Sequence, residues 1–338
     1  MKPAPPGAFV EPDEARKTLG TLGSYQLLER IGAGGLGEVI RARDTVHGRT
    51  VAIKRLPAAL GSDPIRLEQV RRAAASVSAV SHPGLAELYE LGQDQGEWFL
   101  AIEFVPGQTL GQLLGGRPLH PRRATELALE VAEALAALHV AGIVHGDVRP
   151  DNVLVTPKGH AKLIDAGLSP FTAGGALRTT AAARLGALPG AASATLRYMA
   201  PEQVLGEGAD ARADVFALGA VLHEMLTGHP VFDRPAPDEI LLAIVQTAVP
   251  PPDAAGASVP PELTRILQCA MAKSLDRRYL AAGDMAADLR ALKSVFDATL
   301  EQASEPALTP PPSPRGRAVL LVGGAAALLG LLGWLVWN

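Results

Sequence analysis

The chain has 338 residues, of which 48% are hydrophobic, and this suits one large domain or two packed domains with a substantial buried core. The net charge of -4 and the aromatic content of 4% provide no basic or aromatic surface, which argues against nucleic acid as a partner. The single cysteine, Cys269, excludes a disulfide within the chain and is compatible with a reducing cytoplasm.

The first part of the chain is predicted to pass from a disordered segment into a small sheet. Residues 1–24 begin with a stretch rich in proline and charge, without the apolar run that a signal peptide needs. Three β-rich or alternating stretches follow with Gly-containing turns between them: Tyr25 to Ile31, Glu38 to Arg43 and Thr50 to Leu56. They predict an antiparallel meander, and Glu97 to Phe104 is expected to add another strand.

A glycine-rich loop joins the first two predicted strands. The sequence from Ile31 to Val39 places glycines at Gly32, Gly34 and Gly37. Glycines let a hairpin close over a triphosphate with its backbone amides facing the phosphate oxygens. A dinucleotide fingerprint should open a helix, whereas Glu38 to Arg43 is expected to continue as a strand, and a merely flexible hairpin is the remaining alternative.

Lys54 ends the Val-Ala-Ile-Lys segment of the third predicted strand. A lysine at this position is expected to reach the α- and β-phosphates of a nucleotide, although a solvated lysine is the commoner case. Val39 and Ala52 would give apolar contact to the adenine. The backbone from Glu103 to Val105 would supply hydrogen bonds to its edge.

The rest of the folded part is predicted to be helical. Arg122 to His139 and Asp214 to Thr227 are long and too apolar for helices covered by solvent. The predicted fold class is therefore α+β, with a small sheet first and a larger helical part second. The Gly/Ala/Ser/Thr tract from Ala173 to Ala194 has no strong period and is expected to be a long loop.

The octet from His145 to Asn152 is a phosphotransfer signature. Asp147 can orient an attacking hydroxyl and take its proton, and Asn152 can coordinate a magnesium ion that bridges the nucleotide phosphates. Asp165, in an Asp-Ala-Gly turn, offers a second carboxylate for magnesium, although such turns are common in loops. Because this octet occurs with protein and with small-molecule substrates, it does not name the substrate by itself.

The C-terminal end is expected to be a membrane anchor. Residues 318–337 contain no charge, and about 20 helical residues span a bilayer core. Two arginines precede this stretch, so the large N-terminal part should lie on the cytoplasmic side of a single-pass cytoplasmic membrane protein, in contact with inner-membrane lipid. A buried core helix is the alternative, but a Pro-rich linker at 298–317 is expected to separate the stretch from the domain. The small-residue pair Ala326 and Gly330 has the spacing that lets two such helices approach closely, as in a homodimer.

Three further motifs follow the octet in order: Arg197 to Glu202 (Arg-Tyr-Met-Ala-Pro-Glu), Asp214 to Gly219 (Asp-Val-Phe-Ala-Leu-Gly) and Arg278. With them, residues from about Tyr25 to Val295 resemble a bacterial Hanks-type serine/threonine protein kinase. The resemblance implies a bilobal protein-kinase fold over residues 25–297, with an N-lobe at about 25–105 and a C-lobe at about 106–297. It also implies ATP with Mg²⁺, or Mn²⁺ as an alternative ion, and protein substrates that carry serine or threonine.

The resemblance implies structural roles as well as chemical ones. Glu202 should pair with Arg278, Asp214 should brace the catalytic loop, and the segment from Thr195 to Tyr198 should seat the substrate. Arg149 stands where a lysine normally steadies the transferring phosphate. The complete implied site comprises the catalytic residues Asp147 and Arg149, the nucleotide-binding residues Ile31, Gly32, Gly34, Gly37, Val39, Ala52, Lys54, Glu103, Val105 and Leu154, and the metal ligands Asn152 and Asp165.

Three positions depart from the family pattern. Ala73 lies where a helical glutamate should pair with Lys54, and Glu68 could replace it only after a rotation or shift, because it lies roughly 140° around the helix. Gly146 removes the arginine that would bind a phosphate on the activation loop. Ala166 replaces a phenylalanine that packs between the lobes, so the packing there should be loose or compensated.

Three functions follow, in order of preference. An active membrane-tethered kinase is favoured because the groups that touch phosphate and metal are retained. A pseudokinase, acting as an ATP-gated binding module at the membrane, is the alternative that the three departures suggest. A small-molecule phosphotransferase is a distant third.

Overall fold

The computed structural model describes residues 18–34, 37–168, 171, 195–252 and 259–304. Two compact units are distinguished, Met1–Ser294 and Val295–Asn338, and the elements discussed below belong to the first, apart from the end of the last helix. The predicted loop from Ala173 to Ala194 lies outside the described residues.

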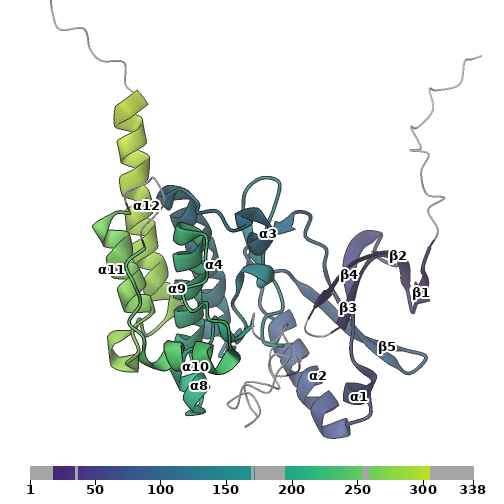
Figure 1. Ribbon diagram of the computed structural model, residues 1–338. Helices are drawn as coiled ribbons and strands as arrows, with labels where there is room; N and C mark the ends of the chain where they lie inside the picture. Colours follow the sequence, from purple (N-terminus) through teal and green to yellow (C-terminus); the bar gives the residue numbers. More distant parts are fainter. Residues whose placement is uncertain (1–17, 35–36, 169–170, 172–194, 253–258, 305–338) are drawn as a thin grey trace, which may run out of the picture. The chain divides into compact units, whose positions relative to one another are not determined.

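The first part of the chain is an antiparallel sheet with the strand order β1-β2-β3-β4-β6-β5 (Figure 1). Its strands are β1 (Gly20–Leu22), β2 (Tyr25–Gly34), β3 (Gly37–Asp44), β4 (Arg49–Arg55), β5 (Leu88–Asp94) and β6 (Glu97–Glu103). The predicted meander is confirmed. The prediction that residues 1–24 are disordered is wrong at its end, because β1 pairs with β2.

Two helices follow β4, namely α1 (Ala58–Gly61) and α2 (Pro64–Ser78). Helix α2 begins where the Asp63 carboxylate accepts hydrogen bonds from the amides of Ile65 and Arg66, at 3.0 and 3.1 Å, and Pro64 takes the first helical position. Its buried face consists of Val70, Ala74 and Val77, and the helix packs on β5.

The second part combines a short sheet with a helical core. The sheet has the order β7-β8-β9, and the predicted helices at 122–139 and 214–227 are confirmed. Its elements are β7 (Gln108–Thr109), α3 (Leu110–Leu114), α4 (Pro121–Val140), η1 (Pro150–Asn152), β8 (Val153–Val155), β9 (Ala161–Leu163), α8 (Pro201–Leu205), α9 (Ala211–Thr227), α10 (Pro237–Gln246), α11 (Pro261–Ala270), η3 (Leu275–Arg277) and α12 (Ala282–Ser304).

Helix α9 is the centre of this core. It is buried from Ala213 to Leu226, as expected for a helix that is apolar on every side, and α4 and α11 pack against it. Asp210 caps its first turn through the amide of Arg212, at 2.8 Å. Gly228 ends it in the left-handed conformation, with φ 82°.

The C-terminal boundary differs from the prediction. Helix α12 continues past residue 297 to Ser304, so the first residues of the predicted 298–317 linker are helical. Within the described ranges, no helix combines the length and the apolar character needed to cross a membrane. The predicted anchor at 318–337 lies outside those ranges.

Candidate active site

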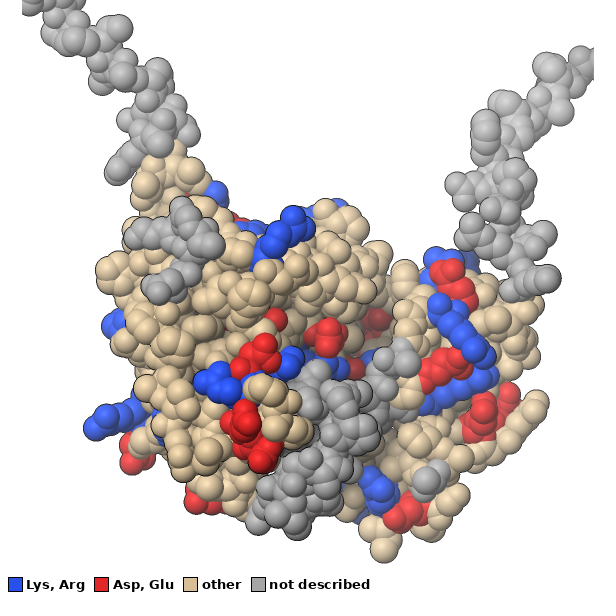
Figure 2. Space-filling model, viewed as in Figure 1, with Lys and Arg blue, Asp and Glu red and all other residues tan. Residues whose placement is uncertain are grey.

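A cavity of about 520 Å³ brings together residues from both sheets. Figure 2 shows acidic and basic side chains gathered in the hollow at the middle of the viewed face. Most of the predicted site residues line the cavity: Ile31, Gly32, Val39, Ala52, Lys54, Glu103, Val105, Arg149, Asn152, Leu154 and Asp165. Residues from β2, β3, β4 and β6 thus face residues of η1 and β8 across one space.

The glycine-rich loop is a hairpin and not a helix start. Strand β2 pairs with β3 up to the pair Gly34 and Gly37, as the kinase-loop interpretation requires. Gly37 has φ 131°, and a β-carbon there would lie 2.6 Å from the Arg55 carbonyl oxygen, so only glycine fits. Gly37 is not among the described residues that line the cavity, and positions 35 and 36 lie outside the described residues.

The apolar end of the cavity is built by neighbouring strands. Ala52 on β4 lies opposite Ile102 on β6, and Leu154 on β8 contributes from the second sheet. At the end of β6, the amide of Glu103 donates to the carbonyl of Glu87 at 2.8 Å. The amide of Glu103 is therefore not available to the edge of an adenine, whereas Phe104 and Val105, which follow it, line the cavity.

Lys54 forms an ion pair with Asp165. The Lys54 side chain is buried, and its ammonium group contacts Oδ1 of Asp165. Asp165 has φ 66°, a left-handed conformation that is uncommon outside glycine, and it lies two residues after β9. The phosphate-binding and metal-binding candidates therefore meet at one point of the cavity.

Helix α2 provides no acidic partner to Lys54. Ala73 occupies the expected position, and Glu68 is exposed and paired with Arg72 at 2.9 Å on the helix surface. The rescue of Lys54 by Glu68 is therefore not found in this structure. Asp165 takes the place of a helical partner.

The catalytic octet holds its two key groups together. The Asn152 amide nitrogen donates to the backbone carbonyl of Asp147 at 2.7 Å and to its Oδ2 at 2.9 Å. Arg149 lies 3.4 Å from the same Oδ2 through Nε and also pairs with Asp151. A carboxylate fixed in this way can accept a proton from a hydroxyl placed next to it.

The loop that carries Asp147 is fixed by helix α9. Both carboxylate oxygens of Asp214 accept backbone hydrogen bonds at 2.8 Å, from the amides of His145 and Gly146. His139 Nε2 lies 2.9 Å from Asp214 Oδ2. The expected brace is confirmed. Gly146 has φ 76°, so the residue that replaces the family's arginine adopts a conformation that other residues rarely take.

The donor set fits a magnesium ion only together with a nucleotide. Among the described residues, no three His, Cys, Asp or Glu side chains cluster as metal ligands. Because the Asn152 nitrogen is committed to Asp147, its Oδ1 is left to bind a cation, and Asp165 retains Oδ2. Amide and carboxylate oxygens suit Mg²⁺, which also takes phosphate oxygens and water.

The segment predicted to seat the substrate is tied to the helical core. The Tyr198 hydroxyl donates to Glu224 Oε2 at 2.5 Å. Burial, together with the adjacent Glu224 charge, raises the pKa of Tyr198, and burial also raises the pKa of Glu224 although the tyrosine hydrogen bond opposes this. Arg197 pairs with Asp233 at 2.7 Å.

The predicted ion pair of Glu202 and Arg278 is confirmed. Arg278 donates to the two carboxylate oxygens at 2.7 and 3.1 Å, and both residues are buried. This bidentate pair joins the start of α8 to the chain that follows η3.

Ala166 is buried although it lacks the ring found in the family. At the next residue, Gly167, a β-carbon would lie 3.0 Å from the side chain of Val77 and 3.2 Å from that of Ile143. Close packing at this point favours compensation for the missing ring over loose packing.

One side of the cavity consists of residues that the sequence did not single out. They include Ala86, Gly107, Gln108, Thr109, Gln112, Asp151 and Ile164. Thr109 and Gln112 form a capping box at the start of α3, a pattern that the sequence does contain. Their place at the cavity depends on the pairing of β7 with β8, which the sequence did not reveal.

The chain is similar in sequence to known proteins. The family described as "Protein kinase domain" matches residues 25–285. The serine/threonine-protein kinase PknB of Mycolicibacterium smegmatis is 37% identical over 271 residues, covering 78% of this chain and 42% of the relative. PrkC of Bacillus subtilis is 35% identical over 277 residues, covering 82% and 41%. The chain thus spans less than half the length of these relatives.

Solved structures agree in fold. The kinase domain of Mycobacterium tuberculosis PknI has a TM-score of 0.60 and 23% sequence identity, covering 80% of this chain and 97% of that domain. At this identity, the similarity concerns the fold.

Proposed function

The chain belongs to the protein kinase family, in its bacterial Hanks-type serine/threonine branch, and from this we propose that it transfers the γ-phosphate of ATP to serine or threonine hydroxyls of proteins. The observation that carries the proposal is the convergence of Lys54, Asp165, Asn152 and Arg149 on one cavity, with Asp147 hydrogen-bonded to Asn152. These are the groups that phosphoryl transfer requires for orientation and charge stabilisation.

Each side chain has a step to perform. Asp147 accepts the proton of the attacking hydroxyl and keeps its oxygen directed at the phosphate. Arg149, next to Asp147, stabilises negative charge on the transferring group, and Lys54 orients the phosphates. Asn152 and Asp165 would hold magnesium, which neutralises charge on the phosphate oxygens when it is bound.

Asp165 must divide its carboxylate between two tasks. Lys54 contacts Oδ1, which leaves Oδ2 for a cation. Because position 73 is an alanine and not a glutamate, Asp165 is the acidic group that holds Lys54 in place. The expected consequence is a reduced rate and not the loss of activity, because the proton acceptor is unaffected.

A pseudokinase is the second candidate, and the same ion pair favours it. If Lys54 and Asp165 remain paired when nucleotide binds, neither is fully available to phosphate or metal. The domain would then bind ATP without turnover and act through its partners.

Residues 318–337 are proposed to anchor the protein in the cytoplasmic membrane, with the kinase domain in the cytoplasm and inner-membrane lipid around the helix. The support is an uncharged stretch of spanning length that follows two arginines. Ala326 and Gly330 make this stretch a candidate for homodimer contact. The full chain should stay with the membranes during carbonate extraction, and deletion of 318–337 should release it. A deletion variant that fractionates as the full chain does would contradict the anchor.

The test of activity uses the full chain in detergent with radiolabelled ATP, Mg²⁺ and an acceptor protein. Asp147→Asn should lower transfer at least about 100-fold, because a general base contributes that much or more. Asp276→Asn, the same substitution at an exposed position in η3, is the control. Equal labelling by wild type and Asp147→Asn would exclude the active enzyme, and ATP binding without transfer would favour the pseudokinase.

A further inference from the structure

A second ion pair joins the first sheet to the strand that leads to Asp165. Lys162 Nζ lies 2.5 and 2.6 Å from the two carboxylate oxygens of Glu103. The side chains are 21% and 26% exposed, so solvent screens the pair only in part. The amide of Glu87 donates to the same carboxylate at 3.2 Å, which holds Glu103 from its other side.

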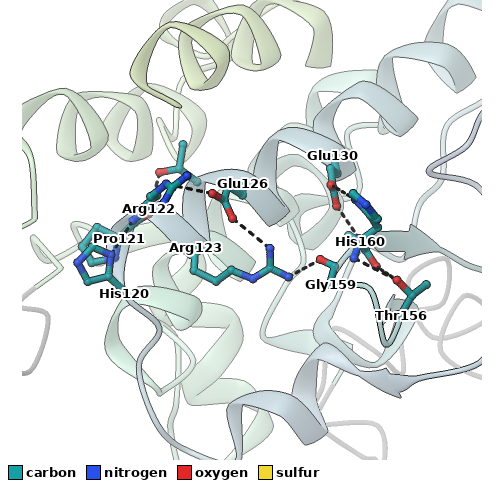
Figure 3. Close-up of polar contacts among 11 residues, drawn as sticks. His120, Pro121, Arg122, Arg123, Glu126, Glu130, Thr156, Gly159 and His160 are labelled. Carbon is teal, nitrogen blue, oxygen red and sulfur yellow. Dashed lines mark hydrogen bonds and ion pairs between the residues drawn. The ribbon is translucent and has the colours of Figure 1, made fainter. Parts of the chain in front are cut away.

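The strand that carries Lys162 is fixed at its other end to helix α4 (Figure 3). Arg123 donates to the carbonyl of Gly159 in the β8–β9 turn. His160 Nδ1 lies 2.8 Å from Glu130 Oε1, and the amide of Ala161 donates to Glu130 Oε2 at 2.5 Å. Because the turn is held by the helical part, the contact of Lys162 with Glu103 ties the end of β6 to that part.

Strand β9 connects the pair of Lys162 and Glu103 to the nucleotide cavity. Side chains alternate along an extended chain, and residues 161–164 alternate between buried and half-buried, so Lys162 and Ile164, which directly follows β9, share a face. Ile164 lines the cavity, and Asp165 follows it. Leu163 between them is buried, and its backbone bonds to Gly84 and Ala86 at 2.8 and 2.9 Å.

The two ion pairs have their charges on opposite sides. In one, the first sheet provides the lysine, because Lys54 of β4 contacts Asp165; in the other it provides the acid, because Glu103 of β6 contacts Lys162. β4 and β6 are paired neighbours, and the other two residues belong to one short stretch of chain. Two ion pairs define both the distance of this stretch from the first sheet and the direction in which the stretch runs, whereas one ion pair would leave the direction open.

We propose that Lys162 and Glu103 are positioning residues that fix the adenine end of the nucleotide site, by holding the end of β6 against β9, the strand that leads directly to Ile164. This role rests on the proposed function, since it concerns the same cavity. Neither side chain is required to touch the reacting phosphate.

The kinetic consequence is specific. Contacts to the adenine are equal in the ground state and the transition state, so their loss raises KM for ATP and leaves kcat unchanged. Lys162→Met should raise KM for ATP, and Kd for ADP with Mg²⁺, roughly tenfold. The KM for the acceptor protein should stay constant. Lys162→Arg, which keeps the charge and the donors, should restore most of the affinity.

The experiment measures ATP kinetics and the binding of a fluorescent ADP analogue on the full chain in detergent. Lys158→Met is the matched control, because Lys158 is an exposed lysine in the turn of the same hairpin. Glu103→Gln and Glu133→Gln form a second matched pair: Glu133 contacts Arg290 within the helical part. Glu103→Gln keeps the size of the side chain, so it provides a folded variant if Lys162→Met fails to fold.

The outcomes separate this role from catalysis itself. A wild type that binds ADP but transfers no phosphate would refute the proposed activity, while the ADP affinities of the variants would still decide the role of the pair. Folded Lys162→Met and Glu103→Gln with nucleotide affinity within twofold of wild type would overturn the proposal. A parallel change of kcat and of both KM values would also overturn it, since a general loss of structure has that signature. A wild type that binds no nucleotide would overturn both proposals.

Discussion

Substitution of Arg278 by methionine should expose how much the buried ion pair contributes to the helical part. Arg278 makes four hydrogen bonds: two to Glu202 at 2.7 and 3.1 Å, one to Ala272 O at 3.1 Å and one to Arg212 O at 3.0 Å. Its guanidinium carbon also lies 5.1 Å from the centre of the Phe216 ring. Methionine can fill much of the volume but can replace none of these hydrogen bonds.

The expected loss follows from what is left behind. Glu202 is 4% exposed, and Arg278→Met would leave its charge buried without this partner. Removal of one member of a buried pair costs about 3–5 kcal/mol, mostly through the charge that stays behind. The double variant Glu202→Gln/Arg278→Met removes that charge as well, so it should recover at least about half of the loss.

The assay is urea denaturation of the full chain, followed by circular dichroism. Arg290→Met is the matched control, because Arg290 pairs with Glu133 at 2.7 Å while their side chains are 56% and 36% exposed. An exposed pair contributes about 0–1 kcal/mol. A loss for Arg278→Met that is no larger than for Arg290→Met would refute the reasoning, and so would a double variant less stable than Arg278→Met.

Three other predictions concern single positions. Ala73→Glu should raise kcat for ATP turnover roughly three- to tenfold, because a carboxylate on α2 could hold Lys54 and release Asp165. An unchanged kcat would contradict this. Gly146→Ala should lower the free energy of unfolding by about 1–2 kcal/mol in urea, because φ is 76° at this residue, and a variant as stable as wild type would show that the loop adapts. For Asp44, burial alone would raise the pKa, but hydrogen bonds from His47 and Arg49 lower it to about 2. Since the pKa of Asp44 in the folded state lies below its unfolded value, the hydrogen bonds of Asp44 contribute about 1–2 kcal/mol above pH 4, and this contribution is lost as the pH falls from 4 to 2. Asp44→Asn should therefore flatten the dependence of the free energy of unfolding on pH in that window. A pH dependence equal to that of wild type would contradict this.

The sequence predicted the parts of the site that depend on local spacing. The octet fixes Asp147 and Asn152 five residues apart, and the structure joins them by hydrogen bonds. The glycine loop was recognised because a predicted strand follows it, and the strand is present. Both are local features, for which the chain itself sets the geometry.

Other features depend on contacts between distant residues. Strand β5 was missed because its sequence, Leu-Tyr-Glu-Leu-Gly-Gln-Asp, lacks a clear alternation and is placed by pairing with β6. The pair of Lys162 and Glu103 joins residues 59 positions apart, and nothing in either segment predicts it. Helix α12 passes the predicted boundary because the chain has no glycine or proline at 297 to end it.

The hydrogen bonds that Asp214 accepts have a consequence for cooperativity. Asp214 lies in the first turn of α9, where almost every residue is buried, so it cannot move without disturbing the core. Displacement of the loop that carries Asp147 would break both of these hydrogen bonds and leave a buried carboxylate without them, which costs about 3–6 kcal/mol. Molecules with a folded core and a misplaced proton acceptor should therefore be rare at equilibrium, so the loop is ordered together with the core.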